Sequence, residues 1–250
     1  MIVSRASALL LLAACLLASP VAAQEFPFPH YAVTAHPSQD GRCRGDPGKA
    51  DLDRSEKACL AQLASIATRK PDTLRVKFQN GSSRTYRDKP RECEGANAYS
   101  DCVRYQLTGY FAKHGLLLIE IDYYEGVEWM LVRLDSGQET KIVAPPHYSP
   151  DENWLASACW SDGPSSCENG IDIVPTMPDH TARDWHYRPP NEDYLLSEFV
   201  GWDGDNRVNL SMTFHAGGQA AGDLITMPAA VERVDGAWQL KLPREYQPRS

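Results

Sequence analysis

The stretch LTGYFAKHGLLLIEIDYYEGVEWMLVRLDSGQETKIVAPPHYSPDENWLASACW, residues 107–160, is the most regular hydrophobic part of the chain. Leu117, Ile119 and Ile121 occupy alternate positions in it. Glu120 and Asp122 occupy the positions between them. Because such alternation is typical of a strand with one buried face, the stretch predicts β structure. We expect four short strands, at residues 117–123, 127–134, 140–143 and 154–160.

Turn residues separate these strands. Gly126 and the segment 135–137 are typical of tight reversals, because Gly adopts positive φ without a steric penalty. Several prolines between residues 145 and 150 interrupt the chain before the fourth strand. In strand 127–134 most odd-numbered and most even-numbered positions are apolar, which favours a strand that is covered on both faces.

The first 23 residues predict a secretory signal peptide. Arg5 precedes an apolar run, and the small residues 21–23 form a cleavage site. The apolar run is too short to span a membrane. The alternative is a lipoprotein, because residues 12–15 fit a lipobox in which Cys15 is lipidated and retained. We expect a periplasmic or secreted protein, or one anchored through Cys15, with no transmembrane span after signal removal.

The chain is acidic. It holds 25 Lys and Arg residues against 33 Asp and Glu residues, for a formal net charge of −8. Removal of residues 1–23 takes away the single positive charge of Arg5 and leaves −9. Phosphate backbones and anionic membrane surfaces repel such a protein, so we expect no nucleic-acid partner.

Six cysteines follow the signal: Cys43, Cys59, Cys93, Cys102, Cys159 and Cys167. An even number of cysteines in an exported chain predicts disulfides, although many pairings are possible. Their spacing favours three local loops, which are Cys43–Cys59, Cys93–Cys102 and Cys159–Cys167. The alternative is a zinc site, but the paired CxxC spacing that zinc sites favour does not occur.

The regions on either side of the central stretch predict further elements. Residues 24–50 are rich in Pro and Gly and favour an extended lead-in. Residues 51–70 predict a helix that ends before Pro71, and residues 72–87 predict a hairpin that turns at Asn80-Gly81. Residues 88–103 and 175–193 predict polar connections. Alternation predicts additional strands at residues 171–174, 194–200, 208–214, 224–231 and 237–242.

Residues 146–156, Pro-His-Tyr-Ser-Pro-Asp-Glu-Asn-Trp-Leu-Ala, resemble a turn of the WD40-like β-propeller repeats in bacterial periplasmic proteins of the TolB type. Those repeats carry Ser-Pro-Asp-Gly, two further residues and Leu-Ala, and Glu152 stands where Gly is usual. Residues 200–208 resemble a second, degraded copy. Asp151 and Asp203 are separated by roughly the length of one blade, which is about 40–50 residues.

The resemblance covers residues 107–242 and implies a mostly β, propeller-like fold that builds a binding surface. It carries no transferable catalytic residue. A blade takes about 40–45 residues, so the chain has room for a small or incomplete β-propeller. The alternative is a twisted β-sandwich. We divide the chain into a signal (1–23), an N-terminal lead-in, helix and hairpin (24–106) and an antiparallel β domain (107–250).

Motifs of common enzyme classes are missing from the sequence, including GxSxG, HExxH, Walker A and GxGxxG. Residues 179–186 contain the densest group of histidines, and residues 203–206 resemble the start of a calcium loop. Both patterns are also typical of solvated loops and turns. We therefore assign no metal site and no cofactor site.

Glu120 and Asp122 share one face of a strand, and Glu125 and Glu128 follow them. Paired carboxylates are the groups that glycosidic hydrolysis requires. Acids on the wet face of a sheet are also ordinary, so we assign no catalytic residue.

Two functional classes remain. The first is a non-catalytic binding or protein-interaction module, of which an inhibitor or immunity-type protein is one form. Its partner would be a protein or an envelope component, and its acidic surface suits a basic one. The second is a secreted hydrolase that uses carboxylates near residues 120–128 or a metal near residues 180–205.

Overall fold

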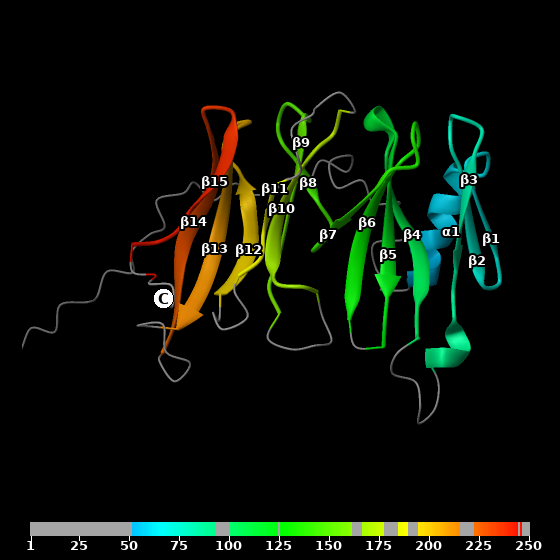
Figure 1. The fold of residues 1–250 in the computed structure, drawn as a ribbon, viewed down its shortest axis with the longest axis horizontal. Helices are drawn as coiled ribbons and strands as arrows, with labels where there is room; N and C mark the ends of the chain where they lie inside the picture. Colours follow the sequence, from blue (N-terminus) through cyan, green and yellow to red (C-terminus); the bar gives the residue numbers. More distant parts are fainter. Residues whose placement is uncertain are drawn as a thin grey trace, which may run out of the picture. The chain divides into compact units, whose positions relative to one another are not determined.

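A computed structural model describes residues 52–93, 101–124, 126–161, 167–177, 185–189, 195–215, 223–244 and 246. All of them belong to one compact unit, Val33–Ser250. They form four antiparallel sheets, one α-helix and two short 3-10 helices (Figure 1). The predicted signal with Cys15, the lead-in with Cys43, Glu125 and residues 179–184 lie outside the described residues. No helix in the described part of the chain is long and apolar enough to cross a membrane.

The N-terminal elements are a helix and a three-stranded sheet. Helix α1 spans Leu52–Gln62, and β1 Ala67–Lys70, β2 Thr73–Lys77 and β3 Ser83–Arg87 pair in chain order. The predicted hairpin is confirmed, with Gly81 at φ +84°. The predicted helix over residues 51–70 is wrong in its second half. Tertiary pairing with β2 outweighs the weak helix propensity of a segment that contains the β-branched residues Ile66 and Thr68.

The second sheet contains β4 Arg104–Phe111, β5 Leu116–Asp122, β6 Val127–Arg133 and β7 Glu139–Ile142, paired in chain order. Three of these strands confirm the prediction. The sequence pattern does not predict β4, because the register shifts between Leu107 and Gly109 and interrupts the alternation. In the chain, the 3-10 helix η1 Pro90–Cys93 precedes β4, and the 3-10 helix η2 Ala112–His114 follows it.

The third sheet has the order β11-β10-β9-β8. Its strands are β8 His147–Tyr148, β9 Trp154–Cys159, β10 Gly170–Pro175 and β11 Trp185–Tyr187. β9 and β10 confirm predicted strands, but β9 does not join the sheet of β5 to β7. Pro145 and Pro146 precede it, and proline lacks the N–H that continues sheet pairing. β11 occupies a segment for which we predicted a polar connection.

The fourth sheet contains β12 Leu195–Trp202, β13 Arg207–His215, β14 Leu224–Val234 and β15 Ala237–Lys241, paired in chain order. All four confirm predicted strands. The last hairpin turns at Asp235 and Gly236, which have φ values of +52° and +83°.

Three buried clusters join each sheet to the next one along the chain. They lie between the first and second sheets, the second and third, and the third and fourth. Representative members are, in that order, Leu74 and Leu117, Leu118 and Leu155, and Ile173 and Val208. The mostly β fold class is therefore confirmed. The described residues form neither a closed barrel nor a closed propeller, so the propeller-like arrangement and the β-sandwich alternative stay predictions.

The N-terminal elements share a core with the second sheet. Cys59 of α1 and Leu74 of β2 lie in one cluster with Ile119 of β5. β4 begins at Arg104 and crosses the predicted domain boundary at residue 106.

Two disulfides lie within the described residues. Cys93 pairs with Cys102, with a Cα–Cα distance of 4.5 Å, and Cys159 pairs with Cys167, with a Cα–Cα distance of 6.3 Å. These are the pairs that the spacing predicts. Cys59 is fully buried and disulfide-bonded, and the pairing with Cys43 stays a prediction because Cys43 lies outside the described residues.

Candidate binding cleft

The turn between β8 and β9 is held by its own side chains. The Ser149 hydroxyl donates to Asp151 Oδ1 at 2.6 Å and accepts from the backbone N–H of Trp154 at 3.0 Å. The N–H of Asn153 donates to the same Asp151 oxygen at 3.0 Å. Glu152 has φ +59°, a left-handed conformation that favours glycine. The backbone therefore keeps the glycine conformation at the position where the resembling repeats carry Gly.

A second turn occupies the equivalent place in the fourth sheet. It joins β12 to β13, as the first turn joins β8 to β9, so each connects the first two strands of a four-stranded meander. Gly204 has φ +62°, and the N–H of Asp203 donates to the carbonyl of Arg207 at 2.9 Å. The two turns touch, since the N–H of Asp151 donates to Asp205 Oδ1 at 2.9 Å.

The second sheet has a corresponding turn at η2, between β4 and β5. Lys113 Nζ lies 2.7 Å from Glu152 Oε2, which joins this turn to that of the third sheet. The Lys113 ammonium holds the pKa of Glu152 below its usual range. The first turns of three successive sheets are thus connected by side-chain contacts.

A cleft of about 290 Å³ opens beside the η2 turn of the second sheet. Its lining includes Gln79, Tyr110, Lys113, His114, Arg133 and Met177. Arg133 forms two hydrogen bonds with the Asp135 carboxylate, at 2.9 and 3.3 Å, and donates to the carbonyl of Thr176 at 3.0 Å. Met177 is 47% exposed at the rim. The cleft therefore combines an aromatic ring, an exposed thioether and fixed charges.

His114 is one of the residues that line the cleft. Its side chain is only 5% exposed, and Nε2 lies 3.6 Å from Glu152 Oε2 without a hydrogen bond. Burial lowers the pKa of His114, and the charge of Lys113 lowers it further. The imidazole is therefore neutral at pH 7, and its protonation would place a cation beside Glu152.

A second cleft of about 340 Å³ lies between α1 and β4 and is lined by charged residues. Arg69 forms ion pairs with Glu56 at 2.6 Å and with Asp88 at 2.7 Å. The Glu56 carboxylate also accepts the N–H of Leu107 at 3.0 Å, and that of Asp88 accepts the N–H of Tyr105 at 3.0 Å. The charged groups of this cluster are paired with one another and with backbone N–H groups of β4. The cluster therefore holds helix α1 against the second sheet.

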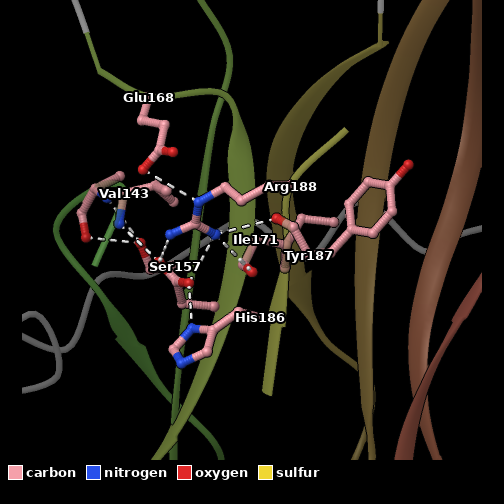
Figure 2. Close-up of polar contacts among 9 residues, drawn as sticks. Val143, Ser157, Glu168, Ile171, His186, Tyr187 and Arg188 are labelled. Atoms are coloured by element: carbon pink, nitrogen blue, oxygen red, sulfur yellow. Dashed lines mark hydrogen bonds and ion pairs between the residues drawn. The ribbon is translucent and has the colours of Figure 1, made fainter. Parts of the chain in front are cut away.

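The buried carboxylate of Asp172 on β10 organises a third polar cluster. Asp172 has no solvent exposure, and it accepts hydrogen bonds from the N–H of Val143 at 2.7 Å and from Arg188 at 2.8 Å. His186 Nδ1 lies 2.7 Å from the same carboxylate. Figure 2 shows the side chains of Arg188 and His186 converging beside Val143, with Glu168 on the other side of the guanidinium. Asp172 is not among the residues predicted from the sequence, although a lone acid within the apolar strand 171–174 is a signal for it.

The cluster links sheets and does not assemble a catalytic triad. Ser157, Asp172 and His186 lie opposite one another on β9, β10 and β11, with the carboxylate in the middle. A triad requires the imidazole in the middle. The Ser157 hydroxyl donates to the carbonyl of Ala144 at 2.7 Å and accepts its N–H at 2.8 Å. Val143 and Ala144 follow the second sheet, so these contacts fasten that segment to the third sheet.

The histidine group at residues 179–186 and the turn at residues 203–206, to which we assigned no metal, have other contacts in the described part of the chain. His186 lies on a strand, and the other histidine of that group lies outside the described residues. In the 203–206 turn, Asp205 contacts Asp151 and Asp203 lies 3.8 Å from Arg207. In the described part of the chain, no group of three or more His, Cys, Asp or Glu residues is arranged to hold a metal ion.

The predicted carboxylates divide between two faces of the second sheet. Glu120 and Asp122 lie two positions apart on β5 and therefore share a face. Glu128 is paired with Ile121, on the opposite face, and lies 2.6 Å from Lys141 Nζ. Burial raises the pKa of Asp122 above its ordinary value. The structure therefore places Glu120 and Asp122 on one face of the sheet and Glu128 on the other.

Comparison with protein-family models and with curated proteins finds no match to the chain. The resemblance to WD40-like repeats therefore depends on the two turns, residues 149–153 and 203–206. The cleft at residues 110–115 and 176–177 is the candidate functional site.

Proposed function

We propose that this protein is an exported, non-catalytic binding module of the bacterial envelope. In this proposal, its four sheets act as blades of an incomplete propeller-like scaffold. One observation carries the proposal: the first turns of three successive sheets are connected through Glu152 with Lys113 and Asp151 with Asp205, and Lys113 also lines the cleft that Met177 borders. Connected turns at one end of stacked sheets are the usual place for a ligand surface.

The polar clusters support binding over hydrolysis. Of the two acids that glycosidic hydrolysis would require, Asp122 is engaged within the sheet, since its Oδ2 accepts a hydrogen bond from Gln106 Nε2 at 3.3 Å. The Ser157 hydroxyl, for its part, is engaged by Ala144.

The partner in this proposal is a protein or an envelope component. The net charge of −8 favours a basic partner through electrostatic steering. An inhibitor or immunity-type protein that blocks a basic hydrolase is one form of this role. Two disulfides in the described residues suit an oxidising compartment such as the periplasm.

Affinity capture from envelope extract tests the proposal. The mature chain, with its disulfides intact, is compared with a Met177→Asp variant and with a matched Val200→Asp control. Both residues are 47% exposed, and only Met177 lines the cleft. We expect the wild type and the control to retain one protein at near-stoichiometric yield, and the Met177 variant to lose it. Equal capture by all three would exclude the cleft as the binding site, and no capture by any would contradict a protein partner.

A further inference from the structure

The first sheet concentrates positive charge in a chain that is acidic as a whole. Residues 67–87 hold six Lys and Arg residues and one acid, Asp72, although the net charge of the chain is −8. Two of the six cations are neutralised, because Arg69 and Arg84 form ion pairs with carboxylates. The cations that form no ion pair with any described residue are Lys70, Arg75, Lys77 and Arg87.

Two of these unpaired cations lie on the central strand, β2. Leu74 and Val76 of this strand are buried in the cluster that the first and second sheets share. Arg75 and Lys77 each follow one of these buried residues. Because successive side chains of a strand point to opposite faces, both cations project away from the second sheet.

The two outer strands add the other two cations to the same face. Thr73 lies two positions from Arg75 on β2 and therefore shares its face. Lys70 of β1 and Arg87 of β3 both lie opposite Thr73, and directly opposite residues project from the same face. Because neighbouring strands lie about 4.8 Å apart, the backbones of Lys70 and Arg87 are about 10 Å from each other.

Hydroxyl groups occupy the remaining strand positions of this face. Thr68 and Thr85 lie opposite Arg75, and Ser83 lies opposite Lys77. The Ser83 hydroxyl accepts hydrogen bonds from Arg75 at 3.0 and 3.2 Å. The strands of the first sheet thus present four cations and four hydroxyls, with no acidic and no apolar side chain at any strand position of this face. All of these side chains are exposed except Thr73, which is half-buried. We call this surface the basic face.

We propose that the basic face binds an acidic polysaccharide whose carboxylates contact the four unpaired cations. An Arg guanidinium forms two parallel hydrogen bonds with a carboxylate, and a Lys ammonium supplies a compact positive charge. The Ser and Thr hydroxyls between the cations both donate and accept hydrogen bonds, as the hydroxyls of a sugar do. A flat grid of charges and hydroxyls therefore matches a chain that repeats both groups.

Other polyanions fit the basic face less well. Single-stranded nucleic acids bind to aromatic rings on which their bases stack, and partner proteins bind through buried aromatic anchors, whereas this face carries no aromatic ring at its strand positions. An anionic membrane is a plane that also repels the other surfaces of an acidic protein. A single polysaccharide chain meets only the face on which it lies.

Isothermal titration of the mature chain, with intact disulfides, against a polyuronate oligosaccharide tests this proposal. We expect saturable binding that weakens steeply as NaCl is raised from about 0.05 to about 0.5 M, because salt screens exposed charges. Neutral dextran offers the same hydroxyls without the carboxylates and should not bind.

Variants locate the ligand. Arg75→Gln combined with Lys77→Gln is expected to weaken polyuronate binding by about tenfold or more, because two charged contacts are removed. Lys241→Gln combined with Arg244→Gln is the matched control: it removes one Lys and one Arg from exposed positions in and after β15, and should change the affinity by less than about twofold. Asp72→Asn removes the acid from residues 67–87 and is expected to strengthen binding by about twofold, a gain that misfolding cannot imitate.

Several results would overturn the assignment. Absence of polyuronate binding by the wild type would do so, as would an equal loss of affinity in the two double variants. Tighter binding of polyglutamate, of a DNA oligonucleotide or of phosphatidylglycerol vesicles than of polyuronate would assign the face to another class of partner and reject the proposal. None of the four cations lines the cleft at residues 110–115 and 176–177, so polyuronate binding and partner capture can fail separately.

Discussion

The backbone N–H of Asp151 donates a hydrogen bond to Oδ1 of Asp205 at 2.9 Å, although 54 residues separate the two in sequence. The contact joins the β8–β9 turn to the β12–β13 turn. Because both turns connect the first two strands of a four-stranded meander, it links equivalent points of neighbouring sheets. A repeat architecture gains stability from such interfaces between neighbours.

Removal of the Asp205 carboxylate tests this link. Asp205→Ala is expected to lower the free energy of unfolding by about 1 kcal/mol, since it leaves the N–H of Asp151 without its acceptor. Asp203→Ala is the control, because Asp203 is 58% exposed and lies 3.8 Å from Arg207, and it should cost less than about 0.5 kcal/mol. Urea unfolding measures the loss of unfolding free energy in both variants. Equal losses would mean that the contact between Asp151 and Asp205 does not stabilise the fold.

Glu152→Gly separates backbone strain from the ion pair with Lys113. Glycine relieves the left-handed conformation at φ +59°, and it also removes a carboxylate 2.7 Å from Lys113 Nζ. In a Lys113→Ala background the ion pair is already absent, so the backbone effect is measured without it. There we expect Glu152→Gly to stabilise the protein by about 0.5–1 kcal/mol in urea unfolding. A loss of stability in that background would mean that Glu152 makes a more important contact than the one with Lys113.

The buried carboxylate of Asp172 should be among the most sensitive positions. Asp172→Ala removes the buried carboxylate to which Arg188 and the N–H of Val143 donate, and we expect a loss of about 3 kcal/mol or more in thermal or urea unfolding. Glu168→Ala removes another carboxylate from the same guanidinium, but Glu168 is 67% exposed and should cost less than about 1 kcal/mol. Similar losses for both variants would contradict the structural role of Asp172.

His114 makes stability depend on pH. Because burial lowers the pKa of His114 in the folded protein, the unfolded chain binds the proton more readily. Stability is therefore lost as pH falls from about 6.5, the unfolded value, through the folded pKa. As the pH is lowered from about 7.5 to about 5.5, the free energy of unfolding of His114→Gln should rise relative to that of the wild type. Urea unfolding at these two pH values measures the change, and parallel behaviour of the two proteins would reject it.

Disulfide connectivity is open to direct measurement. Non-reducing peptide mapping is expected to recover Cys93 with Cys102 and Cys159 with Cys167, as in the structure, and Cys43 with Cys59. A peptide that links Cys43 to Cys159 or Cys167 would contradict the prediction that all three loops are local.

Local chemistry in the sequence determined much of the fold. The alternation of Leu117, Ile119 and Ile121 identified β5 and placed Glu120 and Asp122 on one face. Turn residues such as Gly81 and Gly236 marked hairpins, because a positive φ can be inferred from the residue type itself. The disulfides of the described residues also follow from short spacing.

Tertiary structure alone decided which segments meet. Residues 67–70 could extend a helix or form a strand, and pairing with β2 selected the strand. Lys113 with Glu152, Asp151 with Asp205 and Val143 with Asp172 are contacts between different sheets, and none has a sequence pattern. Alternation and turn chemistry report on neighbours within a few residues. The choice of a distant partner depends instead on how whole sheets bury their apolar faces against one another, which is a property of the folded chain.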